Sequence, residues 1–275
     1  ALNASGAGLI EVASEGGISV EDGADLHLAD AAQLTLRSRA VNHADGIVLG
    51  GNITGRGANV HVSTASSPLG DESGSGITLK AGKAIDVSGN FVNRQASGPN
   101  QQAAWAGGNV TMASTSGLNL QDGSVSGGAT VSSTGVMTGT RAGAITLESQ
   151  NSVGPTQLNF GDVHLGATLQ GQQMANTAKA SNDGSRNDAD SGKLRIKAGD
   201  IRVVAADGGP AIRDGVTKDG LTIGTDLFSQ GGFRNFDLEG VKHLDVAGNA
   251  IIDPQVRQWT PKASAAWAAT GNSMN

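Results

Sequence analysis

The chain has 275 residues, of which 42 are glycine, 3% are aromatic and none is cysteine or tyrosine. The lack of cysteine excludes disulfides, thiolate metal sites and cysteine nucleophiles, and the scarcity of aromatic residues argues against a core built on large aromatic anchors. The formal net charge is −6 with 19 scattered Lys and Arg, which argues against nucleic acid and anionic membrane surfaces as partners.

The first elements in the chain are short segments in which apolar and polar residues alternate. The triplets 18–20, 26–28 and 34–36 each begin eight residues after the last. Alternation with period two predicts short strands with one buried face, and many such strands at a fixed spacing predict a repeat architecture. The pattern is already under way at Leu9-Ile10-Glu11-Val12, so we expect the chain to be a piece of a longer protein.

Pairs of triplets continue along the chain, and the strand starts Ile77, Val110 and Ile145 are expected to be equivalent positions in successive repeats. The pairs are 77–79 with 85–87, 110–112 with 118–120, 194–196 with 201–203, and 236–238 with 244–246. Sandwich and propeller strands are usually longer and carry aromatic residues between layers. The sequence therefore predicts an all-β solenoid, a parallel β-helix with aliphatic residues stacked inside.

We expect one elongated domain, with a rod formed by residues 1–258. Two segments interrupt the pattern and are expected to project from it as loops, at about 93–108 and 170–192. Residues 226–233 concentrate aromatic side chains and are expected to form a bend that leads back into the rod. The Ala-rich residues 259–275 are expected to be a tail that caps the rod with a short helix or frays.

Several segments carry a family resemblance. Residues 76–82, 107–112 and 116–120 resemble repeats of the filamentous-haemagglutinin-like exoproteins of Gram-negative bacteria, which are exported by two-partner secretion. Residues 231–247, beginning Gly-Gly-Phe-Arg-Asn-Phe-Asp-Leu, are similar to a recurring element of the C-terminal half of that family. The resemblance implies a right-handed parallel β-helix, export through an outer-membrane transporter partner, a secreted or cell-surface location, and a role as adhesin, haemagglutinin or stalk. The family's N-terminal secretion domain is not seen here.

Parallel β-helices also host polysaccharide lyases and hydrolases, so the outward carboxylates are candidates for a catalytic pair. Asp86, Asp237 and Asp245 sit at the centres of triplets, but Asp86 is far from the other two in the chain. No catalytic residue is assigned, and no enzyme activity is expected. His27, His61 and His164 are also triplet centres, which predicts outward, solvated rings rather than metal ligands.

The projecting loops hold the candidate ligand contacts. Trp105 is the best single candidate, since its ring can stack on a sugar, although it can equally pin its loop to the rod. Asn187 and Asp188 lie at the polar tip of the second loop. Asp183, Asp188 and Asp190 are weak Ca²⁺ candidates without the glycine and distal glutamate of an EF-hand, so a solvated loop without metal or cofactor is favoured.

These observations predict a structural and adhesive segment of a large secreted, surface-associated filamentous exoprotein. Its partners would be a host-cell surface or glycan receptor, with no nucleic acid and no membrane insertion. Two alternatives stay open: a β-helical polysaccharide lyase or hydrolase, and an inert stalk of a toxin-delivery exoprotein.

Overall fold

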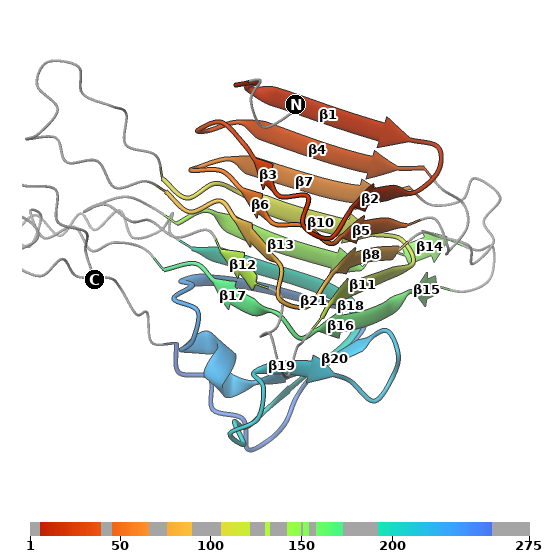
Figure 1. Ribbon diagram of the computed structural model, residues 1–275. Helices are drawn as coiled ribbons and strands as arrows, with labels where there is room; N and C mark the ends of the chain where they lie inside the picture. Colours follow the sequence, from red (N-terminus) through yellow and green to blue (C-terminus); the bar gives the residue numbers. More distant parts are fainter. Residues whose placement is uncertain are drawn as a thin grey trace, which may run out of the picture.

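The chain folds into stacked β-strands that pair mostly in parallel (Figure 1). A computed structural model describes residues 6–39, 46–65, 76–89, 106–121, 130–132, 142–149, 151–153, 158–172 and 192–254. Successive turns of the chain each place one strand in each of three sheets, and we call such a turn a coil. The prediction of an all-β protein of stacked parallel strands is confirmed, and the arrangement is compatible with a β-solenoid.

Five coils have a strand in every sheet. They comprise β1 (Leu9–Ser14), β2 (Ile18–Val20) and β3 (Leu26–His27); β4 (Gln33–Ser38), β5 (Ile47–Leu49) and β6 (Ile53–Thr54); β7 (Asn59–Thr64), β8 (Gly76–Leu79) and β9 (Ala84–Asp86); β10 (Val110–Ser114), β11 (Gly117–Leu120) and β12 (Thr130–Ser132); and β13 (Ala144–Ser149), β16 (Asp162–Leu165) and β17 (Thr168–Gln170). In the fifth coil an antiparallel pair, β14 (Asn151–Val153) and β15 (Leu158–Phe160), is inserted after β13.

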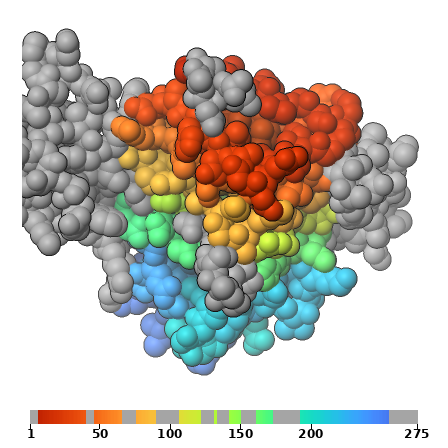
Figure 2. Space-filling view, viewed as in Figure 1, coloured from red at the N-terminus to blue at the C-terminus, as the bar shows by residue number. Residues whose placement is uncertain are grey.

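Each sheet collects the corresponding strand of every coil. Sheet 1 has the order β1-β4-β7-β10-β13-β18-β20-β19, with β21 also paired to β18; sheet 2 has the order β16-β11-β8-β5-β2; and sheet 3 has the order β17-β12-β9-β6-β3. The strands coloured red to green in Figure 1 therefore follow chain order along the stack, and the space-filling view in Figure 2 shows the same order of colours from red to blue. The eight-residue spacing of the triplets near the N-terminus is the spacing along the chain from β2 to β3 and from β3 to β4. Successive triplets therefore belong to sheets 2, 3 and 1 in turn.

The predicted equivalence of strand starts is correct for two positions and wrong for the third. Val110 pairs with Ile145 in sheet 1, as expected. Ile77, however, lies in sheet 2, where it pairs with Leu118 and Ile47. The triplets of all three sheets have the same apolar–polar–apolar pattern, so the pattern alone does not identify the sheet.

The core is a set of aliphatic ladders that run from coil to coil. One ladder of sheet 1 consists of Leu34, Val60, Val110, Ile145 and Leu194, all at most 1% exposed. Adjacent strands lie about 4.8 Å apart, so each side chain packs on its counterpart in the next coil. Such a core needs no large aromatic residue, as the composition predicted.

The C-terminal end departs from the simple coil. It is built from β18 (Lys193–Val204), β19 (Ile212–Asp214), β20 (Gly220–Gly224), a 3₁₀ helix (Thr225–Phe228) and β21 (Asn235–Val246). β21 pairs in parallel with β18 along its whole length, and the register shifts between Ala198 and Asp200. The triplets 194–196 and 201–203 therefore both lie within β18, and the triplets 236–238 and 244–246 both lie within β21.

An irregular segment covers the last strands of sheets 2 and 3, at the bottom of Figure 1. The Val163 amide of β16 donates to the Lys218 carbonyl over 2.9 Å, and the Gly171 amide donates to the Gly231 carbonyl over 2.7 Å. Phe233 is 1% exposed, and its ring lies 2.3 Å from where a Cβ on Gly171 would be. The expected aromatic bend is therefore confirmed, and it closes this end of the core.

Some predictions about domain organisation concern residues outside those the structure describes. Residues 90–105 and 173–191 are outside them, so the two projecting loops stay predictions, as does the tail at 259–275. The assignment of residues 1–258 to one rod is likewise a prediction.

Candidate functional site on the outer face of sheet 1

The outward residues of sheet 1 form a ladder that becomes charged toward the C-terminal end. In order along the stack its rungs are Glu11, Thr35, His61, Thr111, Thr146, Arg195 and Asp237. The next outward row places Glu148 beside Lys197, and Lys197 beside Glu239. Because neighbouring rungs are one strand spacing apart, opposite charges on successive coils come within reach of each other.

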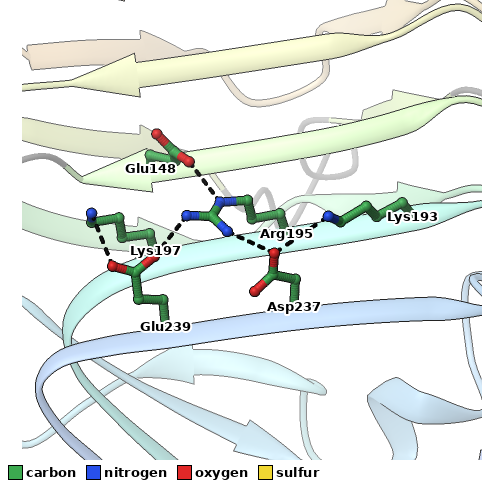
Figure 3. Close-up of polar contacts among 6 residues, drawn as sticks. All are labelled: Glu148, Lys193, Arg195, Lys197, Asp237 and Glu239. Atoms are coloured by element: carbon green, nitrogen blue, oxygen red, sulfur yellow. Dashed lines mark hydrogen bonds and ion pairs between the residues drawn. The ribbon is translucent and has the colours of Figure 1, made fainter.

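Six charged side chains from β13, β18 and β21 form one connected network (Figure 3). Its members are Glu148, Lys193, Arg195, Lys197, Asp237 and Glu239. Arg195 lies at the centre and donates from Nε to Glu148 Oε1 over 2.8 Å, from Nη1 to Asp237 Oδ2 over 2.6 Å, and from Nη2 to Glu239 Oε2 over 2.6 Å. Lys193 Nζ lies 3.3 Å from Asp237, and Lys197 Nζ lies 3.0 Å from Glu239.

The network is electrostatically self-contained. The hydrogen bonds that Arg195 donates to Glu148 and Asp237 raise the pKa of its guanidinium, and Arg195 in turn holds the pKa of Asp237 below its ordinary value. Three carboxylates face three cations, so the formal charges cancel. The arrangement ties three successive strands together, and it leaves no excess charge to attract an ionic ligand.

A second polar cluster lies where β21 bulges against β18. Here two residues of β21, Val241 and Lys242, oppose the single Gly199. The bulge turns Lys242 toward Asp219, a carboxylate with only 9% of its side chain exposed, and the two form an ion pair. A Cβ on Gly199 would lie 2.2 Å from Asp219 Oδ2, so the glycine is what admits this carboxylate.

Asp200 extends the same cluster. It accepts hydrogen bonds from His243 Nδ1 over 2.9 Å and from Thr217 Oγ1 over 3.0 Å. Partial burial by itself raises the pKa of Asp200, but these two hydrogen bonds and the charges of His243 and Lys242 together outweigh it, so the pKa lies below its ordinary value. Thr217 and Asp219 belong to the segment between β19 and β20, so the cluster fastens that segment to the long strands.

The histidines expected to point outward occupy outward positions. His27 is exposed and its Nδ1 lies 2.8 Å from Thr54 Oγ1, while His164 is half-buried and donates to Asp214 over 2.7 Å. His61 is half-buried, so it is less solvated than predicted, and this burial together with the nearby Arg37 charge lowers its pKa. Within the described part of the chain, no group of three His, Asp or Glu residues is placed to hold a metal ion.

The three carboxylates considered for catalysis are dispersed. Asp86 lies on β9 in sheet 3, whereas Asp237 and Asp245 lie on β21. At about 3.3 Å per residue, the step of eight residues from Asp237 to Asp245 along β21 places their Cα atoms more than about 20 Å apart, beyond the roughly 5 to 9.5 Å of a glycosidase pair. Asp245 instead pairs with Arg202 at 3.5 Å.

The predicted ligand contacts fall outside the described residues. This applies to Trp105, Asn187 and Asp188, and to the weak Ca²⁺ candidates Asp183 and Asp190. Conversely, Arg195, Glu148 and the Asp219–Lys242 pair are not predicted as site residues from the sequence. The sequence does contain a signal for Arg195. The triplets Leu194-Arg195-Ile196 and Phe236-Asp237-Leu238 have central residues of opposite charge, which is the pattern expected for residues that neighbour each other on paired strands.

Comparisons with known proteins add no relative. No family model, no curated protein and no solved structure matches this chain. In the portion that the structure describes, there is no helix with the length and apolar character to cross a membrane.

Proposed function

We propose that this chain is a structural and adhesive segment of a large secreted, surface-associated exoprotein of the filamentous-haemagglutinin-like kind, from the C-terminal half of its exported part. In this proposal the stacked coils are a right-handed parallel β-helix, and the parent protein leaves the cell through an outer-membrane transporter. The resemblance of residues 231–247 to that family motivates the assignment.

The observation that carries the proposal is the unbroken inner ladder of sheet 1. From Leu34 to Leu194 every rung is aliphatic and at most 1% exposed, although the chain between rungs varies greatly in length. Stacked coils gain stiffness from nearest-neighbour contacts alone, and they tolerate long insertions between strands. A rod that carries variable loops on a constant core is suited to displaying binding surfaces at a distance from the cell.

The outer face also supports a mechanical role. The network around Arg195 joins β13, β18 and β21, and its charges are satisfied internally. We therefore place receptor recognition in the loops at 93–108 and 170–192, with Trp105 as the principal contact to a host-cell surface or glycan and Asn187 and Asp188 as secondary contacts.

Binding of the purified chain to host cells and to a glycan array tests this proposal. We expect saturable binding that falls by about tenfold or more in Trp105→Ala, as for an aromatic hot spot, and that is unchanged in the matched variant Trp259→Ala. Binding that survives Trp105→Ala and also deletion of both loops would contradict the assignment of recognition. Absence of any binding would instead favour the inert-stalk alternative.

The polysaccharide-cleaving alternative remains a prediction with its own assay. Release of reducing ends from a polysaccharide panel, lost in Asp237→Asn, would establish it in place of the adhesive role.

A further inference from the structure

The ion pair between Lys242 and Asp219 differs from the lysine pairs on the outer face of sheet 1. Lys242 Nζ lies 2.5 Å from Asp219 Oδ2, and only 9% of the Asp219 side chain is exposed. In the pair of Lys193 with Asp237 the two atoms are 3.3 Å apart, and 35% of the carboxylate side chain is exposed. The amine of Lys242 therefore contacts a carboxylate that is largely shielded from water.

Gly199 holds both the main chain and the side chain of Asp219. The Gly199 amide donates to the Asp219 carbonyl over 2.9 Å. A Cβ on Gly199 would lie 2.2 Å from Asp219 Oδ2 and 2.7 Å from Cγ, so a larger residue would take the place of the carboxylate. The bulge in β21 sets Lys242 opposite this same glycine, and the two side chains are thereby kept in contact.

Asp200 fixes the residues that flank the pair. It accepts a hydrogen bond from Thr217, two positions before Asp219, and another from His243, directly after Lys242. One carboxylate on β18 thus holds the chain on both sides of the contact. Groups that are held together in this way react at a very high effective concentration, because the entropy of bringing them together has already been lost.

The contact suits attack of the amine on the carboxyl carbon. A carbonyl C–O bond is about 1.23 Å long, so Lys242 Nζ lies within about 3.7 Å of Asp219 Cγ. Atoms that are about to react are typically about 3–3.5 Å apart. A lysine reacts as a nucleophile in its neutral form. Proton transfer across the contact converts the ammonium and carboxylate groups into an amine and a carboxylic acid, which are the reactive forms.

We propose that Lys242 and Asp219 join in a side-chain amide, an isopeptide bond. The lone pair of Nζ attacks Cγ of Asp219, the N–C bond forms, and one C–O bond of the carboxyl group breaks. Of the three hydrogens of the ammonium group, one stays on the amide nitrogen and two leave with the carboxyl oxygen as water, so no co-reactant is needed. The bond fastens β21 to the segment between β19 and β20. The proposal does not rest on the adhesive function.

Mass spectrometry of the whole chain, purified folded and then denatured, tests the proposal. The chain is expected to be lighter than its sequence mass by one water. Digestion with trypsin and a glutamyl endopeptidase then locates the bond. Cleavage after Glu239 removes residues 235–239, and a modified Lys242 resists trypsin, so we expect a branched peptide that joins residues 219–234 to residues 240–257.

Two conservative variants assign the bond to Lys242. Lys242→Arg keeps the positive charge but lacks the amine, so this variant should have the full mass of its sequence and give no branched peptide. Lys193→Arg is the matched control, because Lys193 also pairs with an aspartate but over 3.3 Å at a more exposed position, and this variant should retain the bond. Circular dichroism of each variant verifies the fold.

Three outcomes would overturn the proposal. The first is a whole chain with the full mass of its sequence, and the second is a branched peptide at a lysine other than Lys242. The third concerns Gly220, which follows Asp219, because an Asp–Gly pair can also lose water by closing to a cyclic imide. Loss of water that persists in Lys242→Arg, without a branched peptide, would identify that reaction in place of the isopeptide bond.

Discussion

The two ends of the stack, as far as the structure describes them, differ in how their core residues are covered. Both end in strands with aliphatic inward residues, but at the N-terminal end the inward Val12 is 36% exposed, whereas its partner Leu36 is 2% exposed, and Val12 lines an apolar cavity. At the C-terminal end Leu227, Phe228 and Phe233 are at most 5% exposed. The contrast teaches that alternating strands build the core, whereas a segment without strand pattern closes it.

Among the described residues, β21 is less covered than the other strands at the C-terminal end. Leu244 and Val246 pair with the buried Ile201 and Val203 but are themselves 51% and 50% exposed. The irregular segment thus covers the last strands of sheets 2 and 3, while β21 has a described strand partner, β18, on one side. Variants at the two ends measure how much each contributes to the free energy of unfolding.

The largest effect is expected from removing the aromatic cover. Phe233→Ala should lower the free energy of unfolding by about 3–5 kcal/mol, because the side chain is fully buried and packs against Phe236 with ring centroids 6.2 Å apart. Urea denaturation followed by circular dichroism measures this change. An effect below about 1 kcal/mol would mean that this segment does not close the core.

A matched pair of leucines compares the inward and outward rows of sheet 1. Leu194→Ala should cost about 2–5 kcal/mol since Leu194 is fully buried, whereas Leu9→Ala should cost less than about 0.5 kcal/mol, because Leu9 is 62% exposed and pairs with the exposed Gln33 in an outward row. The same denaturation experiment compares them. Equal losses would contradict the assignment of Leu9 to the outward row.

The charged network should have a smaller effect. Arg195→Gln removes three charge-assisted hydrogen bonds and leaves Glu148, Asp237 and Glu239 close together, so we expect a loss of about 1–3 kcal/mol. Arg202→Gln is the control, because Arg202 has one longer ion pair at 3.5 Å and is 57% exposed. Similar values for both variants would show that the network has no collective contribution.

Acid should weaken the network within a defined pH range. The folded-state pKa of Asp237 lies below its unfolded value of 3.8, so its stabilising contribution is fully present above pH 3.8 and is lost as the pH falls through the lowered folded pKa. Asp237→Asn should therefore flatten the pH dependence of unfolding below about pH 4, as urea midpoints measured against pH would reveal. If the urea midpoints of this variant below pH 4 change with pH as those of the unmodified chain do, Asp237 does not make this contribution.

The smallest effect is expected at His61, nearer the N-terminal end. Burial lowers its folded-state pKa below 6.5, so the unfolded chain takes up a proton first as the pH falls, and stability declines below pH 6.5 until the folded ring is also protonated. His61→Gln should remove this slope while leaving stability at pH 8 nearly unchanged. The control is His27→Gln, at a more exposed position.

Sequence patterns were sufficient for the strands and the class of fold. Period-two alternation located β2, β8, β10, β11 and β21, because a strand with one buried face requires it. The absence of long aromatic-rich strands pointed to stacked coils. Opposite charges at Arg195 and Asp237 were visible too, but without the register nothing indicated that they are neighbours.

The register and the sites depended on tertiary structure. Ile77 and Val110 have the same local pattern, and only their pairing partners show that they lie in different sheets. Likewise, Lys242 meets Asp219 because a bulge shifts β21 by one residue and Gly199 leaves room for the carboxylate. The sequence by itself determined that short strands with aliphatic inner faces would form, because the alternation of apolar and polar residues is a property of each local segment. The pairing partners, the covering of the two ends and the charge network depend on residues that are distant in the sequence, so only the tertiary structure decided them.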